Sequence, residues 1–108
     1  MSKIAITYEK NTYELEFNRN AVRMMEGQGF NIEELTKQPV TMIPMLFYGA
    51  FSKNHTGIKR NLVEKIFDSL SDKQGLIGVL VEMYAETIST LMDDNSKAEG
   101  NATWEVVK

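Results

Sequence analysis

The chain has 108 residues, of which 43% are hydrophobic and 25% are charged. This length suits one folded domain, and the complete lack of cysteine excludes disulfides, thiolate metal sites and cysteine nucleophiles. The net charge of −3 and the pI of about 5.2 disfavour a nucleic-acid-binding domain, which usually carries a strongly basic face. The sequence contains no apolar run long enough to predict a membrane span or a signal peptide, so we expect a cytoplasmic protein.

The first 17 residues predict a β-hairpin. Apolar and polar side chains alternate over residues 4–8 and again over residues 13–17. The polar connection at residues 9–12 includes Asn11, a residue type that tolerates the positive φ of a tight turn. A lone hairpin is marginally stable in water, so its apolar face should pack on the rest of the chain.

Two short helical segments are predicted next. Asn18 is a suitable N-cap for a helix over residues 19–26, and Gly27 is expected to end that helix. Asn31 can cap a further turn over residues 32–35, whose glutamates suit the positive end of a helix dipole.

A third helix is predicted over residues 40–53. It has almost no polar face, so we expect it to be buried nearly all round. Pro44 should lie in its first turn, because a proline deeper in a helix removes a backbone hydrogen bond and clashes with the preceding turn.

Two more helices complete the pattern. The helix over residues 58–70 is amphipathic. The last helix is expected to begin after a cap at Ser71 or Asp72 and to end near residue 92. Gly75 and Gly78 weaken its first turns, a cost that the close approach of another helix would explain.

These elements predict an α+β fold, mostly α, in which an N-terminal β-hairpin packs on a bundle of about four helices. Residues 1–93 are expected to form a single globular domain, with the hairpin at 4–17 and helices within 18–93. Residues 94–108 are predicted to be a flexible C-terminal tail. Trp104 in this tail would be buried by a partner or a second copy, or alternatively against its own domain.

The sequence offers no constellation typical of catalysis. His55 is the only histidine, and its polar surroundings predict an exposed side chain whose replacement changes stability by less than about 0.5 kcal/mol. The acidic pairs at residues 33–34 and 93–94 are typical of solvated helix ends, and the glycines at 27 and 29 lack a phosphate-binding lysine. We therefore predict that the protein is not an enzyme and has no cofactor, metal site or catalytic residue.

An apolar binding surface is the remaining candidate site. Methionine is flexible and polarisable, so a methionine-rich groove can adapt to many apolar partners, although methionines also fill gaps in cores. We predict a groove between the helix at residues 40–53 and the helix at residues 76–92. The residues predicted to contact a partner are Met42, Met45, Phe47, Phe51, Met83, Met92 and Trp104.

The order of elements carries a resemblance to a known family. A strand of the form Y-x-L-x-F leads into N-R-N-A-V-R-M-M-E-G-Q-G-F-N-I-E-E-L at residues 18–35, and P-x-x-x-x-P-M-L-F-Y-G-A-F follows at residues 39–51. Over about residues 4–92 the chain resembles the small tail assembly chaperones of long-tailed bacteriophages and prophages. The ending at residues 103–105, Thr-Trp-Glu, is similar to the C-terminal segments of that group.

The resemblance implies a protein that binds the long helical tape measure protein, keeps it soluble and helps tail-tube subunits polymerise around it. Its expected partners are the tape measure protein and the tail-tube protein, in the cytoplasm of a bacterial host cell, with no nucleic acid or membrane. One alternative is a small homo-oligomeric structural or adaptor protein of the same phage particle. Another is a transcriptional regulator that uses the basic helix at residues 58–70.

Overall fold

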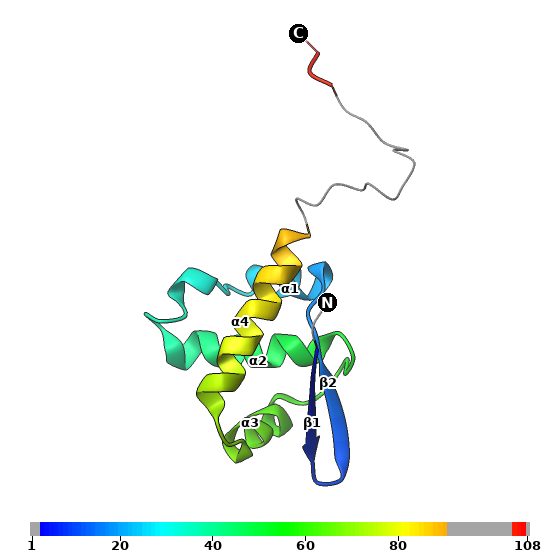
Figure 1. Ribbon diagram of the computed structural model, residues 1–108, viewed down its shortest axis with the longest axis vertical. Helices are drawn as coiled ribbons and strands as arrows, with labels where there is room; N and C mark the ends of the chain where they lie inside the picture. Colours follow the sequence, from blue (N-terminus) through cyan, green and yellow to red (C-terminus); the bar gives the residue numbers. More distant parts are fainter. Residues whose placement is uncertain (1–2, 91–104, 108) are drawn as a thin grey trace.

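The computed structural model describes residues 3–90 and 105–107 and confirms the predicted α+β architecture (Figure 1). A two-stranded antiparallel hairpin is followed by helices that account for most of the described chain. The elements are β1 (Ile4–Tyr8), β2 (Asn11–Leu15), α1 (Arg19–Gly27), the 3-10 helix η1 (Ile32–Glu34), α2 (Pro39–Ser52), α3 (Arg60–Ser69) and α4 (Lys73–Ser89).

The hairpin turns more tightly than its sequence indicates. Ile4 lies opposite Leu15 and Tyr8 lies opposite Asn11, so only two residues connect the strands. Glu9 and Lys10 have φ values of 47° and 72°, as a type I′ turn requires. The predicted connection at residues 9–12 is therefore too long, because Asn11 and Thr12 already belong to the second strand, and the positive φ values fall on Glu9 and Lys10.

The two predicted asparagine caps are confirmed. The side-chain oxygen of Asn18 accepts a hydrogen bond from the Ala21 amide at 2.7 Å, and that of Asn31 accepts one from the Glu33 amide at 2.9 Å. Each satisfies an amide that the helix itself leaves without a partner. The predicted stop at Gly27 is displaced: Gly27 is the last helical residue, and Gly29 takes the positive φ of 101° in the following loop.

Helix α2 differs from its prediction in two ways. It begins at Pro39, so Pro44 lies in its second turn and not in its first. Because Pro44 has no amide hydrogen, the carbonyl of Val40 loses its helical hydrogen bond. Val40 is 88% exposed, so water can reach this carbonyl, which makes Pro44 tolerable in the second turn. The second difference lies in its burial: the exposed residues of α2 are Pro39, Val40, Thr41 and Pro44 in its first turns, whereas none of residues 45–52 is exposed.

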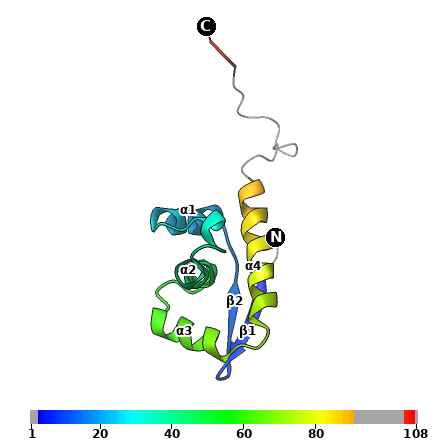
Figure 2. The same ribbon diagram turned by 90° about the vertical axis from the view of Figure 1, so that its left-hand side faces the viewer.

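A single core joins the hairpin to the helices. Tyr84 of α4 packs edge-on against Phe17 at 5.9 Å and Phe30 at 5.3 Å between ring centroids. These contacts connect α4 with the chain after β2 and the loop after α1. Figure 2 shows α2 end-on, with α1 above it, α3 below it, and the hairpin and α4 on one side. The residues with the largest fully buried side chains are Tyr84, Phe47, Phe51, Leu15, Leu46, Ile66, Leu80 and Thr87.

The glycines of α4 have a different role from the predicted one. Asp72 is the N-cap, with a φ of 52°, and its carboxylate accepts a hydrogen bond from the Gly75 amide at 3.2 Å. A Cβ at Gly75 would collide with that carboxylate, whereas a Cβ at Gly78 would meet nothing within 4 Å. The expected close helix contact at Gly78 is therefore wrong. It occurs at Gly49 of α2, where a Cβ would collide with Met25 of α1.

The predicted tail falls mostly beyond what the structure describes. Met92 and Trp104 lie outside the described residues, while residues 105–107 are described and exposed. Within residues 3–90 and 105–107, no helix has the length and apolar character needed to cross a membrane.

A candidate partner-binding groove

An open groove of about 540 Å³ lies where α2, α3 and the start of α4 meet. Figure 2 looks onto this side of the molecule, with α2 seen end-on above α3 and α4 beside them. The residues that line the groove are Pro39, Val40, Ile43, Pro44, Phe47 and Tyr48 of α2, Arg60, Val63, Glu64, Phe67 and Asp68 of α3, and Lys73, Gln74 and Ile77 of α4.

Helical periodicity explains why the lining is apolar. Val40, Ile43 and Phe47 recur at intervals of three and four residues, so they share one face of α2. Val63 and Phe67 are four residues apart on α3 and face them. The rings of Phe47 and Phe67 pack edge-on with centroids 5.1 Å apart, which forms the floor of the groove. Each helix therefore directs an apolar stripe into one shared hollow.

The rim of the groove carries charges of both signs. The guanidinium of Arg60 lies over the ring of Tyr48, 4.8 Å from its centroid. The Lys73 ammonium lies 5.7 Å from the centroid of Phe67 and donates a hydrogen bond to the Leu70 carbonyl at 2.9 Å. Cations held over aromatic faces keep their alkyl stems against apolar surface. The acidic side chains on the rim come from α3, so both signs are within reach of a bound segment.

The structure separates the predicted partner-contacting residues into three groups. Phe47 lies beneath the groove as part of its lining but is only 1% exposed, and Met45 is half-buried outside the lining. Met42, Phe51 and Met83 are 6%, 0% and 2% exposed, so they support the helices from within the core and are not accessible to a partner in this conformation. Met92 and Trp104 lie outside the described residues.

The groove also differs in position from the predicted one. The prediction placed the groove between α2 and α4. In the structure, residues of α3 line one side of the groove, and α4 contributes only its first turns. Val40, Ile43 and Pro44 were missed because their helix was expected to be buried all round. Their three- to four-residue spacing, with a proline among them, is the sequence signal that could have identified them.

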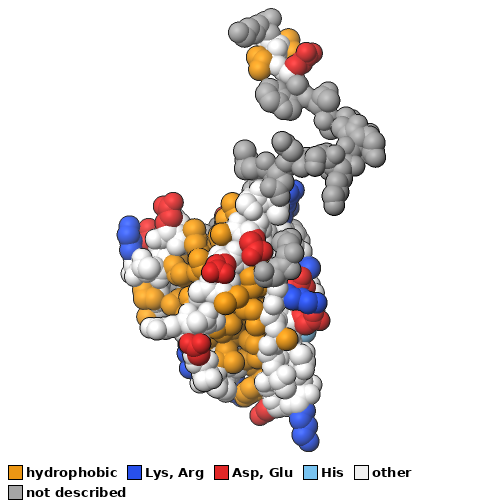
Figure 3. All heavy atoms as spheres, viewed as in Figure 1, with side chains coloured by type: hydrophobic (Ala, Val, Ile, Leu, Met, Phe, Trp, Pro, Cys, Tyr) orange, Lys and Arg blue, Asp and Glu red, His pale blue; other side chains and the backbone are white. Residues whose placement is uncertain are grey.

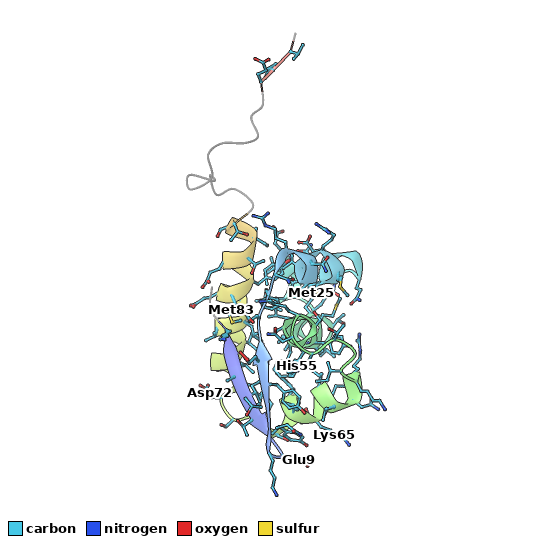
Figure 4. The ribbon with its side chains drawn as sticks, turned by 90° about the vertical axis from the view of Figure 1, so that its right-hand side faces the viewer. Glu9, Met25, His55, Lys65, Asp72 and Met83 are labelled. Carbon is cyan, nitrogen blue, oxygen red and sulfur yellow. The ribbon has the colours of Figure 1, made fainter. Side chains whose placement is uncertain are left out.

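His55 has a structural role that its sequence context does not indicate. It is half-buried, and its Nε2 accepts a hydrogen bond from the Glu14 amide of β2 at 3.0 Å. Its ring packs edge-on against Tyr13 with centroids 5.2 Å apart. Figure 4 shows His55 between the hairpin and the helices. The expectation of an exposed histidine is therefore wrong, and these contacts favour a larger effect of its replacement on stability than the sequence predicts.

The perturbed ionisable groups also serve structure. A hydrogen bond from Asn54 and another from Lys53 hold the pKa of Glu16 below its usual range. Burial and the hydrogen bond that Tyr84 donates to Glu26 at 3.0 Å raise the pKa of Tyr84 to about 12. Across the described part of the chain, no three His, Asp or Glu side chains gather as ligands for a metal ion.

The fold and groove define a small, mostly helical α+β domain with an open apolar surface. A family model described as "Domain of unknown function (DUF5055)" matches residues 1–107, and the chain belongs to this family. Neither a curated protein nor a solved structure matches the chain.

Proposed function

We propose that this protein is a non-enzymatic tail assembly chaperone of a long-tailed phage or prophage. In this proposal the groove binds apolar helical segments of the tape measure protein and so assists tail-tube polymerisation in the host cytoplasm. The sequence resemblance supplies the partner, and the open apolar groove formed by α2, α3 and α4 is the observation that carries the proposal. Val40, which is 88% exposed at its edge, is a large apolar side chain that a bound partner would cover.

The groove suits one face of an amphipathic helix. Such a helix presents apolar side chains at positions i, i+3, i+4 and i+7, which is the spacing that helix-in-groove recognition uses. A volume of about 540 Å³ is within the range of sites that enclose a few side chains, and it is too small to enclose a whole helix. Contact with one helix face buries a limited area, which favours a transient complex that separates as tube subunits arrive.

The mixed rim suits a partner with variable sequence. Arg60 and Lys73 can pair with acidic residues that flank an apolar stripe, and Glu64 and Asp68 can pair with basic ones. Exposed pairs of this kind contribute orientation and association rate more than affinity. Shape and apolar contact would therefore select helical segments, and successive segments of a long helical protein could bind in the same way.

Titration calorimetry of the full chain with helical segments of the tape measure protein from the same phage tests this function. Val40→Glu adds a charge at the groove edge, and its exposed position leaves the core intact. Met24→Glu is the matched control, because Met24 is an exposed apolar residue of α1, 53% accessible, that does not line the groove. We expect Val40→Glu to weaken binding by about tenfold or more and Met24→Glu to leave it unchanged.

Two outcomes contradict the proposal. One is that the wild-type chain binds none of the tape measure segments. The other is that Val40→Glu and Met24→Glu weaken binding equally, which would place the contact outside the groove. A chain that only associates with itself and ignores the segments would favour the alternative of a homo-oligomeric structural or adaptor protein.

A further inference from the structure

The two edges of the hairpin are treated differently by the rest of the chain. On β2, the Glu14 amide donates to His55 at 3.0 Å, and the Glu14 carbonyl accepts from the Asn54 side chain at 3.2 Å. The Glu16 amide, one step further, donates to the Ala50 carbonyl at 3.0 Å. The end of α2 and the loop after it therefore satisfy the outward backbone groups of β2.

The other edge of the hairpin has no such cover among the described residues. Next to a two-residue turn, Tyr8 and Asn11 form a hydrogen-bonded pair, so alternation directs the backbone groups of Ala5 and Thr7 away from β2. Both residues are exposed. Within residues 3–90 and 105–107, no backbone hydrogen bond reaches either of them. We name these outward groups of Ala5 and Thr7 the β1 edge.

The β1 edge also lacks the usual protection against pairing. Proteins block exposed strand edges with proline, bulges or inward-pointing charges. The strand Ile-Ala-Ile-Thr-Tyr has none of these, and its register to β2 is regular along its whole length. In Figure 3, apolar side chains gather between α4 and the hairpin, on the side that this strand borders. Ile4 and Tyr8 of β1 and Val81 of α4 are only partly buried against the core.

We propose that a second copy of this chain pairs with the β1 edge. The two β1 strands run antiparallel about a twofold axis at Ile6 and join the two hairpins into one four-stranded sheet. In this register Ala5 lies opposite Thr7 of the second copy, and each such pair exchanges two backbone hydrogen bonds. This inference is independent of the groove and of the function proposed for it.

Self-complementarity is the reason for choosing a second copy as the occupant. A twofold interface must match a surface to itself. In the proposed register Ile6 meets Ile6 and Ile4 meets Tyr8 of the other copy, which continues the apolar face of both hairpins. Lys3, whose ammonium pairs with Glu14 of its own chain at 3.0 Å, also lies beside Glu9 of the other copy, so opposite charges are close at both ends of the pairing. Figure 4 shows Glu9 at the tip of the hairpin, where it is exposed.

Sedimentation velocity of the full chain over a dilution series tests the interface. Ala5→Pro removes the outward amide of β1 without removing any bond to β2, and we expect it to weaken the dimer by about tenfold or more. Thr12→Pro is the matched control, since Thr12 points outward from β2 at the equivalent position opposite Thr7. It should leave the dimer unchanged. Circular dichroism establishes that both variants keep the wild-type helix content.

Cysteine cross-linking tests the register and does not depend on the proline variants folding. The native chain has no cysteine, so introduced thiols report only on their own positions. Directly opposite residues have Cβ atoms about 5 Å apart, and diagonal ones are about 7–8 Å apart. A mixture of Ala5→Cys and Thr7→Cys chains should therefore cross-link under mild oxidation about tenfold faster than either variant alone.

Three results would overturn the proposal. The first is that the chain stays monomeric at its highest soluble concentration. This includes the case in which another segment of the same chain covers the β1 edge and protects its amides. The second is a dimer that Ala5→Pro and Thr12→Pro affect equally. The third is cross-linking in the mixture that is no faster than in the single variants.

Discussion

Replacing His55 with alanine measures how strongly the hairpin is fixed to the helices. The substitution removes the acceptor for the Glu14 amide at 3.0 Å, the edge-on ring contact with Tyr13 at 5.2 Å and the tilted ring contact with Phe51 at 6.2 Å. It leaves the backbone of the loop after α2 unchanged, including the bond from the His55 amide to the Phe51 carbonyl. The effect should therefore come from the imidazole alone.

The magnitude follows from the hydrogen bond and the ring contacts of the imidazole. A neutral hydrogen bond contributes about 0.5–1.5 kcal/mol, and water can partly replace it at an exposed amide. An aromatic pair adds about 0.5–1.5 kcal/mol when buried, and less for the half-buried ring of His55. We expect His55→Ala to lower the free energy of unfolding by about 1–2 kcal/mol. For a domain of this size that is a fall in Tm of roughly 5–15 °C.

Urea titration and thermal melting of two further variants complete the test. Thr56→Ala, in the same loop at an exposed position, should be neutral. His55→Gln restores an acceptor but not the ring, so its stability should fall between those of wild type and His55→Ala. If His55→Ala were as stable as Thr56→Ala, the link between His55 and β2 would contribute nothing and the reasoning would fail.

The remaining stability predictions concern a tight helix contact and a buried phenol. Gly49→Ala forces Met25 to move, whereas Gly78→Ala has open space around its new methyl group and gains up to about 1 kcal/mol of helix propensity. We therefore expect Gly49→Ala to be the less stable variant in urea titrations. Equal stabilisation by both substitutions would contradict the close contact at Gly49. The pKa of Tyr84 is raised to about 12 in the folded protein, so folding favours the neutral phenol. This contribution to stability is fully present below pH 10 and is lost as the pH rises toward 12. Stability should fall by up to about 2–3 kcal/mol over this alkaline range, and Tyr84→Phe should abolish that fall in melts at several pH values.

Local signals in the sequence were sufficient for the elements and their caps. Asn18 and Asn31 each cap the helix that follows through a hydrogen bond to an amide only two or three residues further along the chain. Such a local bond depends on no contact with distant segments, so the sequence alone predicts it. The alternation over residues 4–8 likewise predicts β1 directly. Asp72 was one of two predicted caps, and its hydrogen bond to Gly75 decides between them.

Contacts between distant segments could not be predicted from these patterns. His55 and Glu14 are 41 residues apart, and a polar loop gives no sign that its histidine will meet a strand. The apolar sequence of α2 shows that much of the helix avoids water, but it does not show which side the hairpin and the other helices cover. Val40 therefore appeared to be a core residue and is 88% exposed at the groove.

The groove and the β1 edge share no residue, so a partner and a second copy would bind without competing. A β1-paired dimer would present two identical grooves, and a tape measure protein with repeated amphipathic helices could engage both. Two weak sites on one scaffold can increase avidity by about 10²–10⁴ while each contact still dissociates quickly. That combination suits a chaperone that must hold a long helix and yet yield it segment by segment to tube subunits.

Ala5→Pro should therefore weaken binding of a long, multi-helix segment but not of a single short helix. Calorimetry with both lengths would detect the difference, and an equal loss for both would mean that the substitution damages the groove itself.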